Sequence, residues 1–271
     1  HSGMEIHKNL GNSNKLLSGV VKDLNNNFPI SIAEINGGGL RNAIPRESSF
    51  IIGVNLSDLE NIKSHSQNLF SIIKNKYAAT DPFVKLNVVK LNQAFKVLES
   101  ESKVNVLSLI EACPNGVYKM SDNIAGLVET SNNLANIQLK QGELIIKCLT
   151  RSSDEPSKEE LKNIIKSLFV KHNYSVEFSG DYPGWQPNMD SEILTKLIEV
   201  YKKLNNSEPN VAACHAGLEC GIIGSHYPKL DMISFGPTIR GAHSPDERAS
   251  VKSTIKFWNF LKEVLLNIPF K

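Results

Sequence analysis

The first 180 residues alternate between helical and strand-like hydrophobic spacing, and this alternation constrains the fold more than any other feature. Residues 12–26 repeat apolar side chains at the spacing of one buried helical face, among them Leu17, Val20 and Leu24. A strand is expected over 29–37, where the chain enters a glycine triplet. The same reasoning predicts helices over 57–77 and 157–173 and, within 103–117, a helix that Pro-Asn-Gly stops. Strands are expected over 48–55, 84–92 and 174–180, and a hairpin over 134–152.

Helices alternating with strands and a hairpin predict a two-layer α+β domain over residues 1–180, with helices on one face of a mixed sheet. The turn-rich stretch 179–190 marks the expected boundary. Residues 181–271 follow an α-β-α-β-α pattern: a helix over 191–204, a strand entering a helix over 210–224, a buried strand over 229–237 and a helix over 249–268. So short a pattern indicates part of an α/β sheet whose other strands come from elsewhere.

The composition places limits on the partners. A formal net charge of +2 is too small to favour nucleic acid or an anionic membrane as main partner. No apolar run approaches the roughly 20 residues that span a bilayer, and the first residues lack the apolar core of a signal peptide. Four cysteines in 271 residues favour reduced thiols in the cytoplasm. The chain begins with His1 and not with Met, which is expected of a processed product, an engineered form or a fragment.

The loop 236–248 joins one histidine, His243, to a Ser-Pro-Asp-Glu sequence. It follows a predicted buried strand, and open α/β sheets place ligands at the carboxyl ends of strands. A neutral His243 there could bind zinc, with Asp246 or Glu247 holding the ring or the loop. One histidine is not a zinc site, since three or four protein ligands are normal. The alternative interpretation is an exposed, inert loop histidine.

The segment 214–221 is the second candidate. If a helix began near His215, then His215 and Glu219 would lie four residues apart on one face and could share a ligand or metal. Cys214 beside His215 also suggests a nucleophile, but adjacent side chains point in different directions. The alternative is a closely packed strand-to-helix turn with Cys214 and Cys220 as small buried side chains.

The third candidate is the loop 36–47, where three glycines are followed by Arg41, Asn42 and Arg46. An Arg–Asn pair suits a carboxylate, because the guanidinium is a forked charged donor and the amide a neutral one. Arg151, at the end of a predicted strand, is of the same kind. The alternative is a polar hairpin loop. Phosphate-loop, dinucleotide, nucleophile-elbow and His-Glu-x-x-His motifs are absent, and none of the seven histidines has Asp two residues on.

Six segments carry a resemblance to a known family, in order and with similar spacing. They are HSGMEIHKNLGNSNKLL, NGGGLRNAIPRE, PNGVYKMSDNIAGLVETSNNLANI, GDYPGWQP, HAGLECGI and DMISFGPTIRGAHSPDE. The chain resembles the Xaa-His (aminoacyl-histidine) dipeptidases of the zinc-dependent aminoacylase, carboxypeptidase and carnosinase superfamily. The resemblance implies that residues 1–180 are a lid and dimerisation domain and that 181–271 are the C-terminal part of the α/β catalytic domain.

The resemblance also implies roles on the substrate side of the active site. His1 matches a lid histidine that polarises the scissile carbonyl, often across the dimer. Asn42 and Arg151 match positions that hold the substrate's carboxylate, and Gly217 and Glu219 match a segment that lines the pocket. The implied reaction is metal-assisted hydrolysis of small peptides of the Xaa-His type by a cytoplasmic homodimer.

The implied metal site holds two zinc ions, with manganese or cobalt as alternatives, and His243 matches its last ligand. In the family the His-x-Asp pair, the other ligands and the general base lie upstream of the lid, and these 271 residues lack them. We therefore expect a chain that is inactive without an upstream half. A catalytically incomplete binding or dimerisation module is the alternative, and an unrelated hydrolase using Cys214 and His215 is a third.

Overall fold

The computed structural model describes residues 1–186, 188–213, 215, 218–241 and 247–268. Within them the chain divides into two compact units. The first contains His1–Gly184 together with Cys214–Ala216, and the second contains Trp185–Ala213 and Gly217–Lys271. No helix in the described ranges combines the length and the apolar character that a membrane crossing requires.

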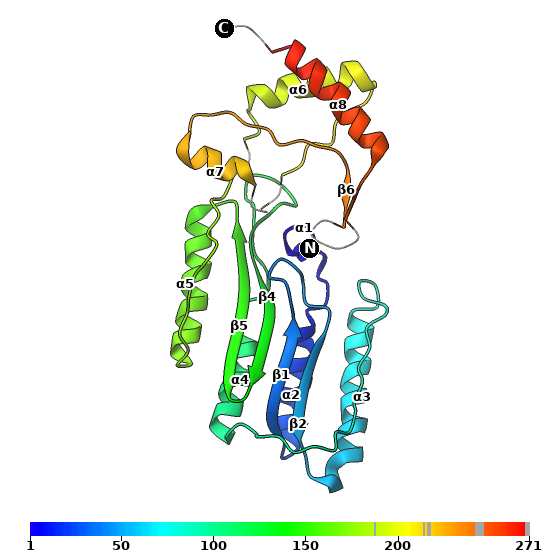
Figure 1. The fold of residues 1–271 in the computed structure, drawn as a ribbon, viewed down its shortest axis with the longest axis vertical. Helices are drawn as coiled ribbons and strands as arrows, with labels where there is room; N and C mark the ends of the chain where they lie inside the picture. The colour runs from blue at the N-terminus through cyan, green and yellow to red at the C-terminus, as the bar shows by residue number, and fades with distance from the viewer. Residues whose placement is uncertain (187, 214, 216–217, 242–246, 269–271) are drawn as a thin grey trace. The chain divides into compact units, whose positions relative to one another are not determined.

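A five-stranded sheet forms the centre of the first unit (Figure 1). Its strands are β1 (Ser31–Gly38), β2 (Ser48–Gly53), β3 (Gly116–Met120), β4 (Val128–Lys140) and β5 (Glu143–Ser152). The order is β2-β1-β4-β3, with β5 also paired to β4. The long β4 strand pairs with β5 along one edge and is shared by β1 and β3 along the other. All four described pairings in this sheet are antiparallel, so the expectation of a mixed sheet is wrong.

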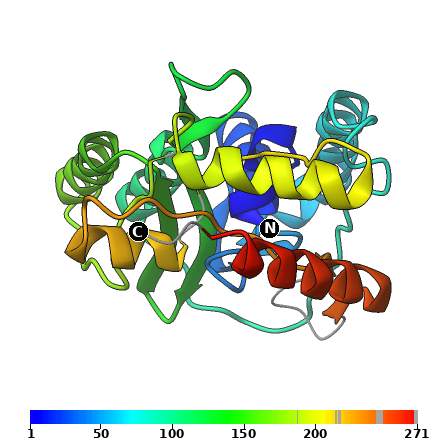
Figure 2. The same cartoon turned by 90° about the horizontal axis from the view of Figure 1, so that it is seen from above.

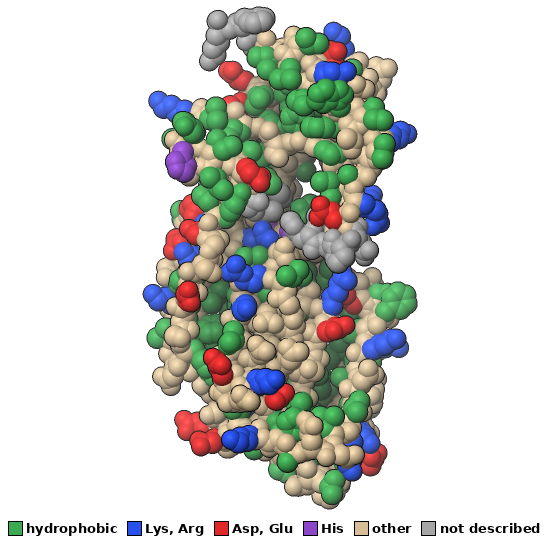
Figure 3. Space-filling model, in the orientation of Figure 1, with side chains coloured by type: hydrophobic (Ala, Val, Ile, Leu, Met, Phe, Trp, Pro, Cys, Tyr) green, Lys and Arg blue, Asp and Glu red, His purple; other side chains and the backbone are tan. Residues whose placement is uncertain are grey.

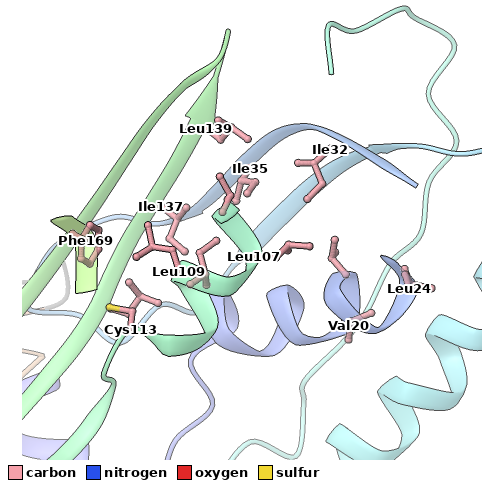
Figure 4. Packing of buried hydrophobic residues seen from close by; sticks show 14 of the residues in the cluster. Val20, Leu24, Ile32, Ile35, Leu107, Leu109, Cys113, Ile137, Leu139 and Phe169 are labelled. Atoms are coloured by element: carbon pink, nitrogen blue, oxygen red, sulfur yellow. The ribbon is translucent and has the colours of Figure 1, made fainter. Parts of the chain in front are cut away.

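Helices cover one face of this sheet. They are α2 (Ser13–Asn27), α3 (Leu59–Lys76), α4 (Ser100–Ala112) and α5 (Glu155–Lys171), with short turns at α1 (Ser2–Glu5), η1 (Ile6–Lys8) and η2 (Leu56–Asp58). In Figure 1, α2 and α4 lie behind the strands, with α3 and α5 at the two sides. Figure 4 shows Leu109 of α4 beside Ile137 of β4, and Val20 and Leu24 of α2 belong to the same buried cluster. The two-layer α+β prediction for this part of the chain is confirmed.

The local predictions held where neighbouring residues decide the structure. The hairpin turns at Gln141 and Gly142, whose φ angles of 54° and 84° fit a two-residue turn of the type that matches the twist of paired strands. Helix α4 ends at Ala112, directly before the Cys-Pro-Asn-Gly sequence. The helix predicted to begin at residue 57 begins at Leu59, with Asp58 at the N-cap of α3 and without a side-chain cap bond.

Two predicted strands of the first unit are absent from the described structure. Residues 84–92 and 174–180 have no strand assignment. Val88, Val89 and Leu91 are all exposed, whereas a half-buried strand would hide alternate side chains. Neither stretch has a neighbouring strand, and a strand requires a partner for its backbone hydrogen bonds.

The second unit holds the remaining elements, α6 (Glu192–Asn205), α7 (Glu219–His226), β6 (Ile239–Arg240), β7 (Arg248–Ala249) and α8 (Val251–Leu266). Helices α6 and α8 lie side by side (Figure 2) and share a small core of Leu197, Val200, Phe260 and Val264. The strand predicted at the start of 210–224 and the strand predicted over 229–237 are absent from the described residues of these ranges. The only pairing described here is the two-residue ladder of β6 and β7, which offers these stretches no sheet to join.

The visible face of the first unit carries Lys and Arg side chains interspersed with Asp and Glu (Figure 3). Such mixing keeps the local potential small, in line with the nearly neutral composition.

Candidate substrate-binding site

The N-terminal residues are held on the loop between β1 and β2. His1 is the N-cap of α1, and its Nδ1 accepts a hydrogen bond from the Gly3 N–H at 3.1 Å. The Ser2 N–H donates to the Asn42 carbonyl at 2.8 Å. The structure thus brings together His1 and Asn42, two residues that are 41 positions apart in the sequence. Both side chains are partly exposed.

The side chain of Asn133 in β4 holds the loop between β1 and β2 by two hydrogen bonds. Its Nδ2 donates to the Arg41 carbonyl at 3.0 Å and to the Ala43 carbonyl at 2.7 Å, and its side chain is buried. At the start of the loop, the Gly38 N–H donates to the Glu47 carbonyl at 3.0 Å. These bonds orient the backbone on both sides of Asn42.

Arg151 lies at the end of β5, directly opposite Ser131 of β4. Ser131 is two residues before Asn133, so both side chains point to the same side of the strand. The half-buried Arg151 therefore projects from the same region of the sheet that holds the Asn42 loop. The prediction of a charge at a strand end is confirmed in position.

His215 is the residue whose surroundings differ most from expectation. Its side chain is buried, with 4% of the residue exposed, and its Nε2 lies 2.8 Å from the Ser131 Oγ. Burial, reinforced by the positive charge of Arg151 and by His7, lowers the pKa of His215 from 6.5 to about 4. The imidazole is therefore neutral at pH 7.

The predicted pairing of His215 with Glu219 is wrong. Helix α7 begins only at Glu219, so His215 does not occupy the preceding turn of that helix. The two residues also belong to different compact units, His215 to the first and Glu219 to the second. Glu219 is exposed at the start of α7.

Three of the predicted residues, His1, Asn42 and Arg151, thus share one end of the first unit with His215. Gly217 and His243 lie outside the described residues, as do Cys214 and Asp246, while Glu247 is exposed. Sequence reasoning missed Ser131 and Asn133. The available signal was the unbroken polar run Thr-Ser-Asn-Asn directly before the predicted hairpin, since polar side chains that become buried require specific partners.

The chemistry of this region suits an anionic group. It combines a guanidinium, a carboxamide and a neutral imidazole, which are hydrogen-bond donors for a carboxylate. In the ranges that the structure describes, no group of three or more His, Cys, Asp and Glu residues is placed to hold a metal ion. The donors of this region therefore suit a small carboxylate.

Comparisons with known proteins agree with this architecture. Residues 1–81 match the family model of the peptidase dimerisation domain. The cytosol non-specific dipeptidase of Escherichia coli is 38% identical over the whole chain, which covers 56% of that protein. The aminoacylhistidine dipeptidase of Vibrio alginolyticus has a crystal structure with a TM-score of 0.86 and 33% identity, and the chain covers 55% of it. A succinyl-diaminopimelate desuccinylase of Nautilia profundicola is 25% identical over 124 residues, which are 46% of this chain and 33% of that protein.

The chain spans about half the length of the two dipeptidases. The resemblance to the dipeptidases that the sequence motifs indicated is confirmed along the whole chain, and so is the combination of a lid-type domain with a further α/β part. The chain is therefore similar along its whole length to the cytosol non-specific and aminoacylhistidine dipeptidases, and its residues 1–81 match a peptidase dimerisation domain.

Proposed function

We propose that the chain supplies the substrate side of a metal-dependent dipeptidase. One arrangement supports this proposal. Arg151 lies opposite Ser131 of β4, and Asn133 of β4 holds the loop that contains Asn42. The N-terminal turn is bonded to the same loop. Full-length similarity to two dipeptidases supports peptide hydrolysis as the reaction class. Small dipeptides of the Xaa-His type are the proposed substrates.

In this proposal Arg151 binds the free carboxylate of a dipeptide through its forked N–H groups, and the Asn42 amide adds a neutral donor. Holding that carboxylate at a fixed place selects peptides of two residues. His1 polarises the scissile carbonyl, a role in which a well-placed donor contributes roughly 2.7–4 kcal/mol. The family resemblance assigns Gly217 and Glu219 to the lining of the substrate pocket.

The metal part of the proposal rests on the family resemblance and on His243, since the described residues do not form a metal site. A pair of zinc ions, or manganese or cobalt in their place, would activate the attacking water. His243 is the one ligand that we assign to this chain. The remaining ligands and the general base would come from an upstream half, without which the chain would be inactive.

The dimerisation-domain match supports a homodimer formed through residues 1–81. The cytosolic relative supports a cytoplasmic location. We assign no nucleic acid and no membrane as partners, in line with the small net charge.

The test is a binding measurement on the purified chain. A dipeptide with a free carboxylate is expected to bind at least about tenfold more tightly than the same dipeptide amide, because the amide lacks the charge that Arg151 would hold. Isothermal calorimetry measures both affinities. Arg151→Met should abolish the difference, and Arg46→Met, which changes an exposed arginine in the loop, should preserve it. Equal affinities for the dipeptide and its amide would contradict the assignment of Arg151 to the substrate's carboxylate.

A catalytically incomplete dimerisation module is the second candidate, supported by the match of residues 1–81 to a peptidase dimerisation domain. Zinc titration separates the two. In the dipeptidase proposal His243→Ala lowers the zinc affinity of the chain, because an imidazole ligand is lost. Unchanged zinc binding in that variant would favour the non-catalytic module. His226→Ala, an exposed histidine of α7, is the matched control.

A further inference from the structure

Two cysteines meet in the core of the first unit. Cys113 directly follows α4 and is buried, while Cys148 lies in β5 opposite Leu134. Their Sγ atoms are 3.8 Å apart. Figure 4 shows Cys113 at the end of α4 with its sulfur directed toward the β4–β5 hairpin. The two residues are 35 positions apart, so only the tertiary structure joins them.

A cation lies beside this pair. The Lys15 Nζ donates to the carbonyls of Ile110 at 2.7 Å and Glu111 at 2.8 Å, and to the carbonyl of Cys113. Its partly buried charge acts on both thiols in the direction of the thiolate. The contact between the two thiols lowers the pKa of Cys148, and the same contact together with burial raises the pKa of Cys113. Cys148 is thus the more acidic of the two thiols.

A cavity lies beside Lys15, whose amine donates to the Cys113 carbonyl. Lys15 lines this cavity of about 80 Å³ together with Ser18, Lys22 and Glu111. One water needs roughly 10–15 Å³ of such volume, so a small oxidant such as a peroxide fits in the cavity. The exposed fraction of Cys148 is also intermediate, unlike that of Cys113.

We propose that Cys113 and Cys148 are a dithiol that a peroxide oxidises to a disulfide, which joins the end of α4 to β5. The Cys148 thiolate attacks one peroxide oxygen, the O–O bond breaks, and Cys148 becomes a sulfenic acid while hydroxide leaves. Cys113 then attacks the Cys148 sulfur, the S–O bond breaks, and the hydroxyl leaves as water with the Cys113 proton. In total two thiols and one peroxide give one disulfide and two waters.

The geometry requires a small movement. A disulfide has an S–S distance of about 2.05 Å, so the sulfurs must approach from 3.8 Å by side-chain rotation and a slight backbone shift. The product would link the β4–β5 hairpin to the helix layer three residues before Arg151. Oxidation would therefore reduce the freedom of the strand end that presents this arginine.

The purified full chain, reduced and then exposed to hydrogen peroxide, is the sample for the test. Peptide mapping without reductant should recover a Cys113–Cys148 cross-linked pair that has lost two hydrogen atoms, and dithiothreitol should reverse it. The thermal unfolding midpoint of the oxidised chain should be higher than that of the reduced chain, because the bond restricts the unfolded chain. Neither measurement depends on the proposed dipeptidase activity.

Cysteine-to-serine variants show which residues form the disulfide. Cys148→Ser and Cys113→Ser should each abolish the cross-link, and Cys220→Ser, which removes a thiol of the second unit, should leave it unchanged. The proposal is overturned if the wild-type peptides show separate sulfinic acids on Cys113 and Cys148, or unmodified thiols at both. Cross-links from either residue to Cys214 or Cys220 would overturn it as well.

Discussion

Gly38→Ala is expected to destabilise the first unit by about 3 kcal/mol or more. Gly38 has a φ of +72°, where an L side chain is strained by roughly 1–2 kcal/mol. A Cβ at this position would lie 1.8 Å from the Ala135 carbonyl oxygen, which belongs to the backbone of β4 and cannot rotate away. Relieving the clash requires β1 and β4 to separate, at a cost typical of overpacking, about 1–3 kcal/mol.

Gly39→Ala is the matched control in the same triplet. A Cβ on Gly39 meets nothing within 4 Å, and its φ is not in the left-handed region. Urea denaturation followed by circular dichroism compares both variants with the wild type, and hydrogen exchange of the β4 amides localises the loss. If Gly38→Ala proved as stable as Gly39→Ala, the close approach of β1 and β4 at this point would be wrong.

The stability of the first unit is expected to fall by about 3 kcal/mol as the pH drops from 6.5 to 4, through His215 alone. The folded pKa of about 4 lies below the unfolded value of 6.5, so the unfolded chain binds the proton more tightly. The contribution of this group is therefore fully present above pH 6.5 and is lost progressively as the pH falls toward 4. Denaturation at a series of pH values measures the slope.

His215→Gln should flatten that slope, because glutamine does not titrate in this range. It can keep a hydrogen bond to the Ser131 hydroxyl, so the variant is expected to fold. His226→Gln changes an exposed histidine and should retain the wild-type slope. Titration of His215 by NMR gives a direct check. A pKa near 6.5 in the folded chain would contradict the buried, neutral state.

Some turns, helix ends and helix faces of this protein are determined by the local sequence. The Gln141–Gly142 turn, the end of α4 before Pro114 and the amphipathic face of α2 depend on residues within a few positions of one another. Turn preferences and the 3.6-residue period act at that range, so these elements were predictable. The family motifs likewise identified His1, Asn42 and Arg151 before their neighbours were known.

The tertiary structure decided the features that depend on contacts between residues far apart in the sequence. Residues 84–92 alternate like a strand but have no strand beside them, and β propensity cannot form a sheet without a partner. Whether His215 continues α7 or lies buried against Ser131 is a matter of packing between residues 84 positions apart. Spacing along the chain defines faces and turns, whereas burial and long-range hydrogen bonds decide which polar side chains meet. For this reason the sequence indicated the residue types of the site, and only the folded sheet placed Arg151, Asn42 and His215 around one strand.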